Sequence, residues 1–151
     1  MPAPVPTPIG RELARVAKSV ARAFDDELAA AGGSLPQWLI LISLKTRQLA
    51  SQRELAEAVG IQGATLTVHL DAMQTHGLLT RRRDPTNRRV HLVELTAEGQ
   101  EAFSRLRRAA ADFDHQLRAG ISDRDIATLY RLLARLQHNV ADEVSAADAT
   151  S

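Results

Sequence analysis

The stretch SQRELAEAVGIQGATLTVHLDAM, residues 51–73, decides the fold. Ser51, followed three residues later by Glu54, forms a capping box, which predicts that a helix begins here. Gly60 is expected to end that helix, because glycine adopts a left-handed turn without steric cost. A second helix is expected over residues 63–76. The stretch therefore predicts two short helices joined by a tight turn.

Three positions in this stretch have the spacing of a helix-turn-helix. The small Ala56 lets the second helix cross the first closely, Gly60 forms the turn, and Leu66 seals the inner face. An αα-corner with no nucleic-acid role has the same local pattern. The residues that follow must distinguish the two.

After residue 77 the pattern changes from a helical to an alternating period. Residues 78–82 and 89–95 flank the turn-forming sequence DPTN at 84–87 and predict a β-hairpin. Within nine positions, five arginines surround one acidic residue at its tip: Arg81, Arg82, Arg83, Arg88 and Arg89. The whole chain has a net charge of only +1, so this concentration favours a phosphate-binding site over an ordinary solvated face.

Long helices flank this central region. Apolar residues repeat every three or four positions over 9–28, 103–117 and 126–140, which indicates amphipathic helices. Their apolar stripes are longer than a small central core can cover. We therefore expect the stripes to meet a second copy of the chain.

Composition excludes several classes of protein. The 151 residues include no cysteine, which removes disulfides, thiolate nucleophiles and cysteine-based metal sites. No apolar run approaches the roughly 18–20 residues of a membrane span, and the N-terminus lacks signal-peptide features, so a cytoplasmic location without a membrane partner is expected. Common catalytic motifs are absent, and we expect neither enzyme activity nor a cofactor. His69 and His76 lack a nearby carboxylate pair, so no metal site is expected.

Together these motifs resemble the MarR family of bacterial winged-helix regulators. The resemblance covers about residues 9–140 and is carried by SQRELA at 51–56, ATLT at 64–67, GLL at 77–79, DP at 84–85, RR at 88–89 and LT at 95–96. It implies a mainly α fold with one β-hairpin wing, in which a winged helix-turn-helix lobe is joined to a helical dimerisation domain. It also implies a homodimer whose two lobes face double-stranded DNA.

On this basis the chain is expected to have four regions. They are a flexible proline-rich arm over 1–8, a helical dimerisation region over 9–33 and 97–144, a winged helix-turn-helix DNA-binding region over 34–96, and a flexible tail over 145–151.

The resemblance implies specific DNA contacts. The helix over 63–76 would enter the major groove, and the wing tip would enter the adjacent minor groove, where an arginine meets enhanced negative potential. The residues expected to contact DNA are Ser51, Gln52, Gln62, Ala64, Thr65, Thr67, Val68, Arg81, Arg88 and Arg89. A pocket for a small aromatic or phenolic ligand is implied between the dimer helices and each lobe, but its residues are not identified. Trp38 and Arg22 are candidates by location, and Trp38 fits an ordinary core position equally well.

The sequence departs from the family pattern in the recognition helix and in the wing. Family members often carry arginine at the positions of Val68 and Ala72, whereas residues 62–76 contain neither Lys nor Arg. We therefore expect weaker DNA affinity, or an operator read through thymine methyl groups against Val68 and Ala64. Asn87 replaces an aspartate that would brace a wing arginine, which predicts a looser wing.

Two functions follow from these observations. The first is a DNA-binding, ligand-responsive repressor that binds a pseudo-palindromic operator as a homodimer. The second is a winged-helix ligand-binding or protein-interaction module with weak or lost specific DNA binding.

Overall fold

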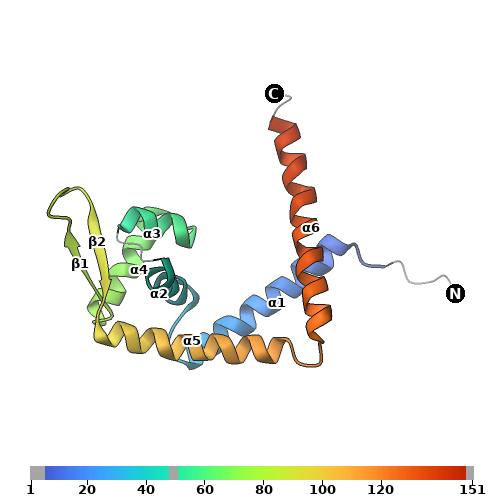
Figure 1. Ribbon diagram of the computed structural model, residues 1–151, viewed down its shortest axis with the longest axis horizontal. Coiled ribbons are helices and arrows are strands. Elements are labelled where there is room, and N and C mark those ends of the chain that lie inside the picture. Colours follow the sequence, from blue (N-terminus) through green and yellow to red (C-terminus); the bar gives the residue numbers. More distant parts are fainter. Residues whose placement is uncertain (1–5, 48–50, 149–151) are drawn as a thin grey trace. The chain divides into compact units, whose positions relative to one another are not determined.

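The structure, a computed structural model, describes residues 6–47 and 51–148, which form six helices and one β-hairpin (Figure 1). The elements in chain order are α1 (Ile9–Ala30), α2 (Leu35–Arg47), α3 (Gln52–Val59), α4 (Gly63–Thr75), β1 (Leu79–Arg83), β2 (His91–Leu95), α5 (Ala97–Leu117) and α6 (Asp123–Asp148). The chain divides into two compact units, one ending at Phe113 and the other beginning at Asp114. The mainly α fold with one hairpin wing is confirmed.

Hydroxyl caps begin several helices, among them the helix for which the sequence predicted a cap at Ser51. The Ser34 Oγ accepts a hydrogen bond from the Gln37 backbone N–H at 3.3 Å, and the Ser51 Oγ accepts one from Glu54 at 3.1 Å. At the start of α6 the Ser122 Oγ accepts the Asp125 N–H at 3.1 Å. Each cap satisfies a backbone donor that has no partner within the helix.

The core of the first unit includes residues of α1 and α5 as well as the central elements. Leu28 of α1 and Leu106 of α5 are fully buried, and Phe24 stacks on Phe113 with ring centroids 5.1 Å apart. The compact units therefore have a different boundary from the expected functional regions. The reason is that the apolar stripes of α1 and of the first part of α5 pack in part on the lobe.

The wing is an antiparallel hairpin whose register runs from Leu79 opposite Leu95 to Arg83 opposite His91. The pairing is shorter than the sequence indicated, since residues 84–90 form the connection. Local hydrogen bonds explain the longer loop: the Asp84 carboxylate accepts from Thr86, and the Asn87 side chain accepts from the backbone of the second residue after it. Such side-chain bonds to nearby backbone compete with the strand ladder.

The C-terminal helix is longer than expected, and both ends of the chain lie outside the described residues. The helix α6 continues to Asp148, beyond the expected end at residue 144, and the added segment contains two alanines, which have the highest helix propensity. Residues 1–5 of the predicted arm and 149–151 of the predicted tail lie outside the described residues. Within the described ranges, no helix is both long enough and apolar enough to span a membrane.

Candidate nucleic-acid interface

The helices α3 and α4 form the predicted helix-turn-helix. Gly60 has φ +76°, in the left-handed region, and its N–H donates to the Ala56 carbonyl at 2.9 Å to end α3. Leu55 of α3 and Leu66 of α4 are fully buried, so the two helices share an apolar inner face. The turn and the burial together fix the direction in which α4 leaves α3.

Four exposed residues at the N-cap and in the first two turns of α4 are uncharged. Val68 is 66% exposed, and Gln62, Ala64 and Thr65 are also exposed. These residues offer methyl groups, one hydroxyl and one amide to a partner. In a major groove such groups contact thymine methyls and form single hydrogen bonds with base edges.

Two of the predicted contact residues are bonded to each other. The Gln52 side-chain amide donates to the Thr67 hydroxyl at 2.8 Å, and that hydroxyl donates to the Gly63 carbonyl at 2.9 Å. Gln52 and Thr67 are both half-buried. The chain of bonds joins the first turn of α3 to the first turns of α4, so it stabilises the helix-turn-helix from its outer side.

The five wing arginines have different environments. Arg81 forms an ion pair with Asp71 of α4, and Arg82 pairs with Glu94 of β2 at 3.1 Å. The guanidinium of Arg83 donates to the backbone carbonyl of Arg88 at 3.1 Å. Three of the five positive charges therefore have partners within the protein.

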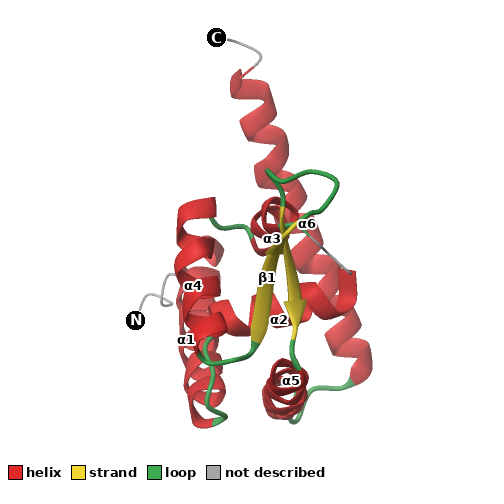
Figure 2. Cartoon of the chain, turned by 90° about the vertical axis from the view of Figure 1, so that its left-hand side faces the viewer, coloured by secondary structure: helices red, strands yellow, loops and turns green. Residues whose placement is uncertain are grey.

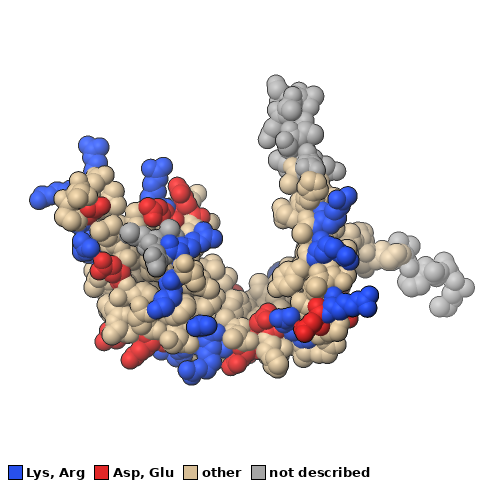
Figure 3. Space-filling view, viewed as in Figure 1, with Lys and Arg blue, Asp and Glu red and all other residues tan. Residues whose placement is uncertain are grey.

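The other two arginines occupy the loop at the end of the hairpin. Arg88 and Arg89 are exposed, and among the described residues neither has an acidic partner within ion-pair distance. Figure 3 shows cationic side chains projecting from this end of the hairpin. Within the described part of the chain, this pair has neither an acidic nor a carbonyl partner, whereas Arg83, which also keeps its charge, is held by the Arg88 carbonyl.

Local bonds hold the loop that carries these arginines. The Thr86 hydroxyl and backbone N–H donate to the Asp84 carboxylate at 2.7 and 2.8 Å. These bonds lower the pKa of Asp84 below its ordinary value of 3.8, because they stabilise the ionised carboxylate. The bond from the Thr86 hydroxyl has the largest effect. The Asn87 amide oxygen accepts the Arg89 N–H at 3.2 Å, so Asn87 orients the loop backbone rather than an arginine side chain.

A hollow of about 890 Å³ lies between the helix-turn-helix and the wing. The strand β2 contacts α3, and β1 contacts α4. Figure 2 looks onto the hairpin, with α4 beside it. The structure places five of the ten predicted contact residues on its lining: Ser51, Gln52, Gln62, Thr67 and Arg89. Ala64, Thr65 and Val68 lie on the outward face of α4, Arg88 lies in the loop, and Arg81 faces α4.

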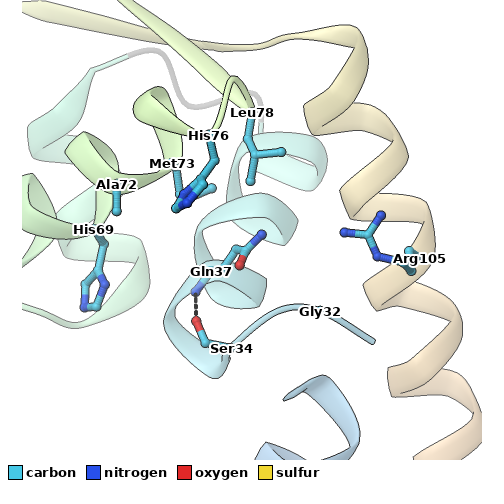
Figure 4. A pocket seen from close by; sticks show the side chains of 9 residues that line it. All are labelled: Gly32, Ser34, Gln37, His69, Ala72, Met73, His76, Leu78 and Arg105. Atoms are coloured by element: carbon cyan, nitrogen blue, oxygen red, sulfur yellow. Dashed lines mark hydrogen bonds between the residues drawn. The ribbon is translucent and has the colours of Figure 1, made fainter. Parts of the chain in front are cut away.

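A second, smaller hollow of about 350 Å³ lies beside another face of α4 (Figure 4). His69 of α4 and His76, the C-cap of that helix, line it, Gln37 lines it from α2, and Arg105 extends toward it from α5. The Arg105 Nε donates to the Ala31 carbonyl at 2.7 Å, which anchors this side chain. The lining contains no acidic residue, and Met73 and Leu78 add apolar surface.

Sequence reasoning did not find this hollow. The seven-residue spacing of His69 and His76 placed them near one face, but Gln37 and Arg105 belong to helices far away in the sequence and gave no local signal. Trp38, considered as a ligand contact, is buried and stacks on Phe103 with centroids 5.8 Å apart. Within the described residues, no cluster of three metal-ligating side chains occurs.

Comparison with known proteins agrees with this geometry. The sequence profile of the MarR family matches residues 34–91. Among solved structures, the chain is similar to the transcriptional repressor CouR bound to a 23-mer DNA duplex, with 26% identity, a TM-score of 0.76, and coverage of 86% of this chain and 92% of CouR.

Two further structures have the same fold. A probable transcriptional regulator from Pseudomonas aeruginosa is 29% identical, with a TM-score of 0.73 and coverage of 85% of this chain and 96% of that one. The PcaV transcriptional regulator from Streptomyces coelicolor, in complex with its natural ligand, is 23% identical, with a TM-score of 0.73 and coverage of 89% and 97%. The match to the MarR family of transcription regulators thus covers the helix-turn-helix and the first strand of the wing, and the chain has the fold of solved regulators such as CouR over most of its length.

Proposed function

We propose that this protein is a repressor that binds a pseudo-palindromic operator as a homodimer and responds to a small aromatic or phenolic ligand. One observation carries the DNA-binding part: a single compact unit presents the exposed, uncharged residues at the start of α4 together with the exposed arginine pair Arg88 and Arg89. Phosphate contacts provide affinity and orientation, while base-edge contacts provide sequence preference. The repressor CouR, bound to DNA, supports the assignment by similarity.

The homodimer is supported by apolar surface on the first and last helices. On α1, Ile9 is 67% exposed and Val16 is 42% exposed. On α6, Leu132 is 52% exposed and Val140 is 57% exposed. Apolar stripes of this length rarely face water in a stable monomer. A two-fold dimer would place two α4 helices on half-sites about one DNA turn apart.

The ligand response is assigned to the hollow beside α4. Arg105 and two histidines can bind a carboxylate or phenolate, and Met73 and Leu78 can contact an apolar ring. Because His69 belongs to α4 and His76 caps its C-terminus, a bound ligand would contact the DNA-reading helix directly. A ligand that favours one position of α4 changes DNA affinity, and DNA changes ligand affinity by the same factor. The proposed place of action is the cytoplasm.

Selection of bound duplexes from a random pool, at about physiological salt, tests the function, since non-specific phosphate binding is suppressed there. We expect enrichment of a two-fold symmetric site. If the folded dimer enriches no site, the alternative of a ligand-binding or protein-interaction module is favoured. The absence of Lys and Arg from the recognition helix is the observation behind that alternative.

Sedimentation equilibrium tests the dimer. Replacing Leu132 and Leu136 by Asp is expected to give monomers or unfolded chain, because both lie on the apolar stripe of α6. Arg131→Asp is the control, since Arg131 is exposed and lies roughly opposite that stripe at about 100° per residue. A folded, fully dimeric Leu132→Asp/Leu136→Asp variant contradicts the proposed interface.

A further inference from the structure

Arg81 differs from the other wing arginines in the direction of its side chain. It pairs in register with Val93, which is 4% exposed, and it shares the inner face of the hairpin with the buried Leu79. Its side chain is 19% exposed, against 55% for Arg82 on the opposite face. The pleat of β1 therefore turns Arg81 toward the protein and away from the solvent-exposed tip.

The guanidinium of Arg81 contacts two consecutive turns of α4. Its Nη2 forms a short charge-assisted hydrogen bond with the Asp71 carboxylate, and its Nε donates to the Gln74 amide oxygen at 2.7 Å. Asp71 and Gln74 are three residues apart and thus lie on the same side of the helix. Two bonds from one planar group fix the rotation of α4 about its axis as well as its distance from β1.

The contact also changes the charge of the recognition helix. Asp71 is the single acidic residue of α4, and its side chain is 59% exposed. An unpaired carboxylate there would repel DNA phosphates. The pair with Arg81 neutralises that charge, and in doing so Arg81 gives up its own charge as a source of phosphate attraction.

We propose that Arg81 is a positioning residue that joins the wing to the recognition helix, so that α4 and the tip arginines meet DNA in one fixed arrangement. The inference rests on the proposed DNA-binding function and reassigns Arg81, which the sequence placed among the direct contacts. Since His69 of the same helix and its C-cap His76 line the smaller hollow, the contact also passes a ligand-induced shift of α4 to the wing.

Alanine variants of Arg81 and Asp71, alone and together, distinguish positioning from direct phosphate contact. Positioning predicts that each single variant weakens binding of the selected duplex about tenfold, and that the double variant binds no more weakly than the weaker single variant. Direct contact predicts the opposite sign for Asp71→Ala: removing a carboxylate would leave binding unchanged or tighter. Unchanged or tighter binding by Asp71→Ala therefore overturns the proposal.

A second pair on the same hairpin provides the matched control. Arg82 and Glu94 form a comparable ion pair on the outer face, with both side chains more than half exposed. An Arg82→Ala, Glu94→Ala cycle is expected to show coupling below about twofold, because exposed pairs contribute little. Equal coupling in the two cycles would show that the Arg81 contact has no special role.

A measurement without DNA separates this inference from the function on which it rests. Amide hydrogen exchange in β1 is expected to accelerate in Arg81→Ala and to stay near wild type in Arg82→Ala. If no duplex binds the wild-type protein, the proposed function fails, while the exchange result still tests the Arg81 contact. Unchanged exchange in Arg81→Ala would overturn the inference even for a protein that binds its operator.

Discussion

The helix α4 and the wing differ in the charges that they offer to a partner. The helix α4 contains neither Lys nor Arg and presents Val68, Ala64 and Thr65 outward. The wing carries five arginines, but only Arg88 and Arg89 lack an acidic or carbonyl partner among the described residues. A run of arginines in the sequence therefore does not tell how many of the charges are free to contact a partner, or where those charges lie.

The difference between α4 and the wing can be measured in DNA binding. If the wing tip supplies the phosphate contacts and α4 reads base edges, changes at the tip alter the salt dependence of binding, whereas neutral changes on α4 alter sequence preference. Four substitutions or measurements test whether the wing tip and α4 have these separate roles.

The largest effect is expected where the wing joins α5. A Cβ added at Gly99 would lie 1.9 Å from the Leu78 carbonyl oxygen, a backbone atom that no side-chain rotation can move. The Thr96 hydroxyl, which caps α5 by accepting the Gly99 N–H, also donates to the Gly77 carbonyl at 2.6 Å, so the wing base and α5 are tied together. Gly99→Ala is expected to lower the free energy of unfolding by about 3 kcal/mol and to displace the wing.

Thermal unfolding measures this loss of stability. Gly63→Ala is the control, because Gly63 is helical and nothing lies within 4 Å of its added Cβ. That control should be neutral or more stable by up to about 1 kcal/mol, since alanine favours the helix. A Gly99→Ala protein as stable as wild type would show that the wing base tolerates movement, which would weaken the case for a fixed wing.

Removing both tip arginines should alter DNA binding next most strongly. Arg88→Ala/Arg89→Ala is expected to weaken duplex binding by about tenfold to fiftyfold and to reduce the salt slope by about two units, because two phosphate or minor-groove contacts are lost. Fluorescence anisotropy over a salt series measures both quantities. Arg124→Ala, at an exposed position in the first turn of α6, is the control. An unchanged slope in the double variant contradicts the role of the tip.

Adding a positive charge to α4 tests whether this helix approaches the DNA phosphates. Val68→Arg is expected to tighten binding about fivefold and to increase the salt slope by about one unit, since position 68 is exposed at the centre of the outward face. Val68→Gln, which is long but neutral, should change sequence preference without changing the slope. Equal slopes for the two variants would mean that position 68 does not approach phosphates.

The smallest effect concerns pH and the wing loop. Hydrogen bonds from Thr86 lower the pKa of Asp84 in the folded protein below 3.8, so the stabilisation is complete above about pH 3.8 and is lost as the pH falls through the lowered value. NMR titration of the Asp84 carboxyl carbon should give a midpoint below 3.8. Thr86→Ala should return the midpoint toward 3.8, whereas a wild-type midpoint at or above 3.8 contradicts the loop geometry.

Local rules were enough to predict most of the elements. Ser51 with Glu54 is a signal that depends on residues within one turn, and the structure confirms that cap. The left-handed Gly60 also follows from a local requirement. The hairpin was predicted, but its loop was longer than expected because Asp84 and Asn87 bond to nearby backbone in preference to the ladder.

Features that depend on distant residues were not predictable in the same way. Arg81 looks like its neighbours in the sequence, and its different environment depends on the strand register and on Asp71 in another element. The one available signal was the alternation of side chains along β1, which places Arg81 on the same face as the buried Leu79. The hollow beside α4 needs Gln37 and Arg105 from separate helices, and no local pattern joins them.

The arrangement of contacts around α4 has an evolutionary consequence. The buried Leu66 and Leu70, the polar bonds of Thr67 and the pair of Asp71 with Arg81 hold the helix in place, while Val68 is 66% exposed and lies opposite the buried leucines. Substitutions at the outward positions can therefore change operator preference without a cost to the scaffold. Drift of regulatory targets between lineages should accordingly concentrate at positions 64, 65 and 68, with positions 71 and 81 changing together or not at all.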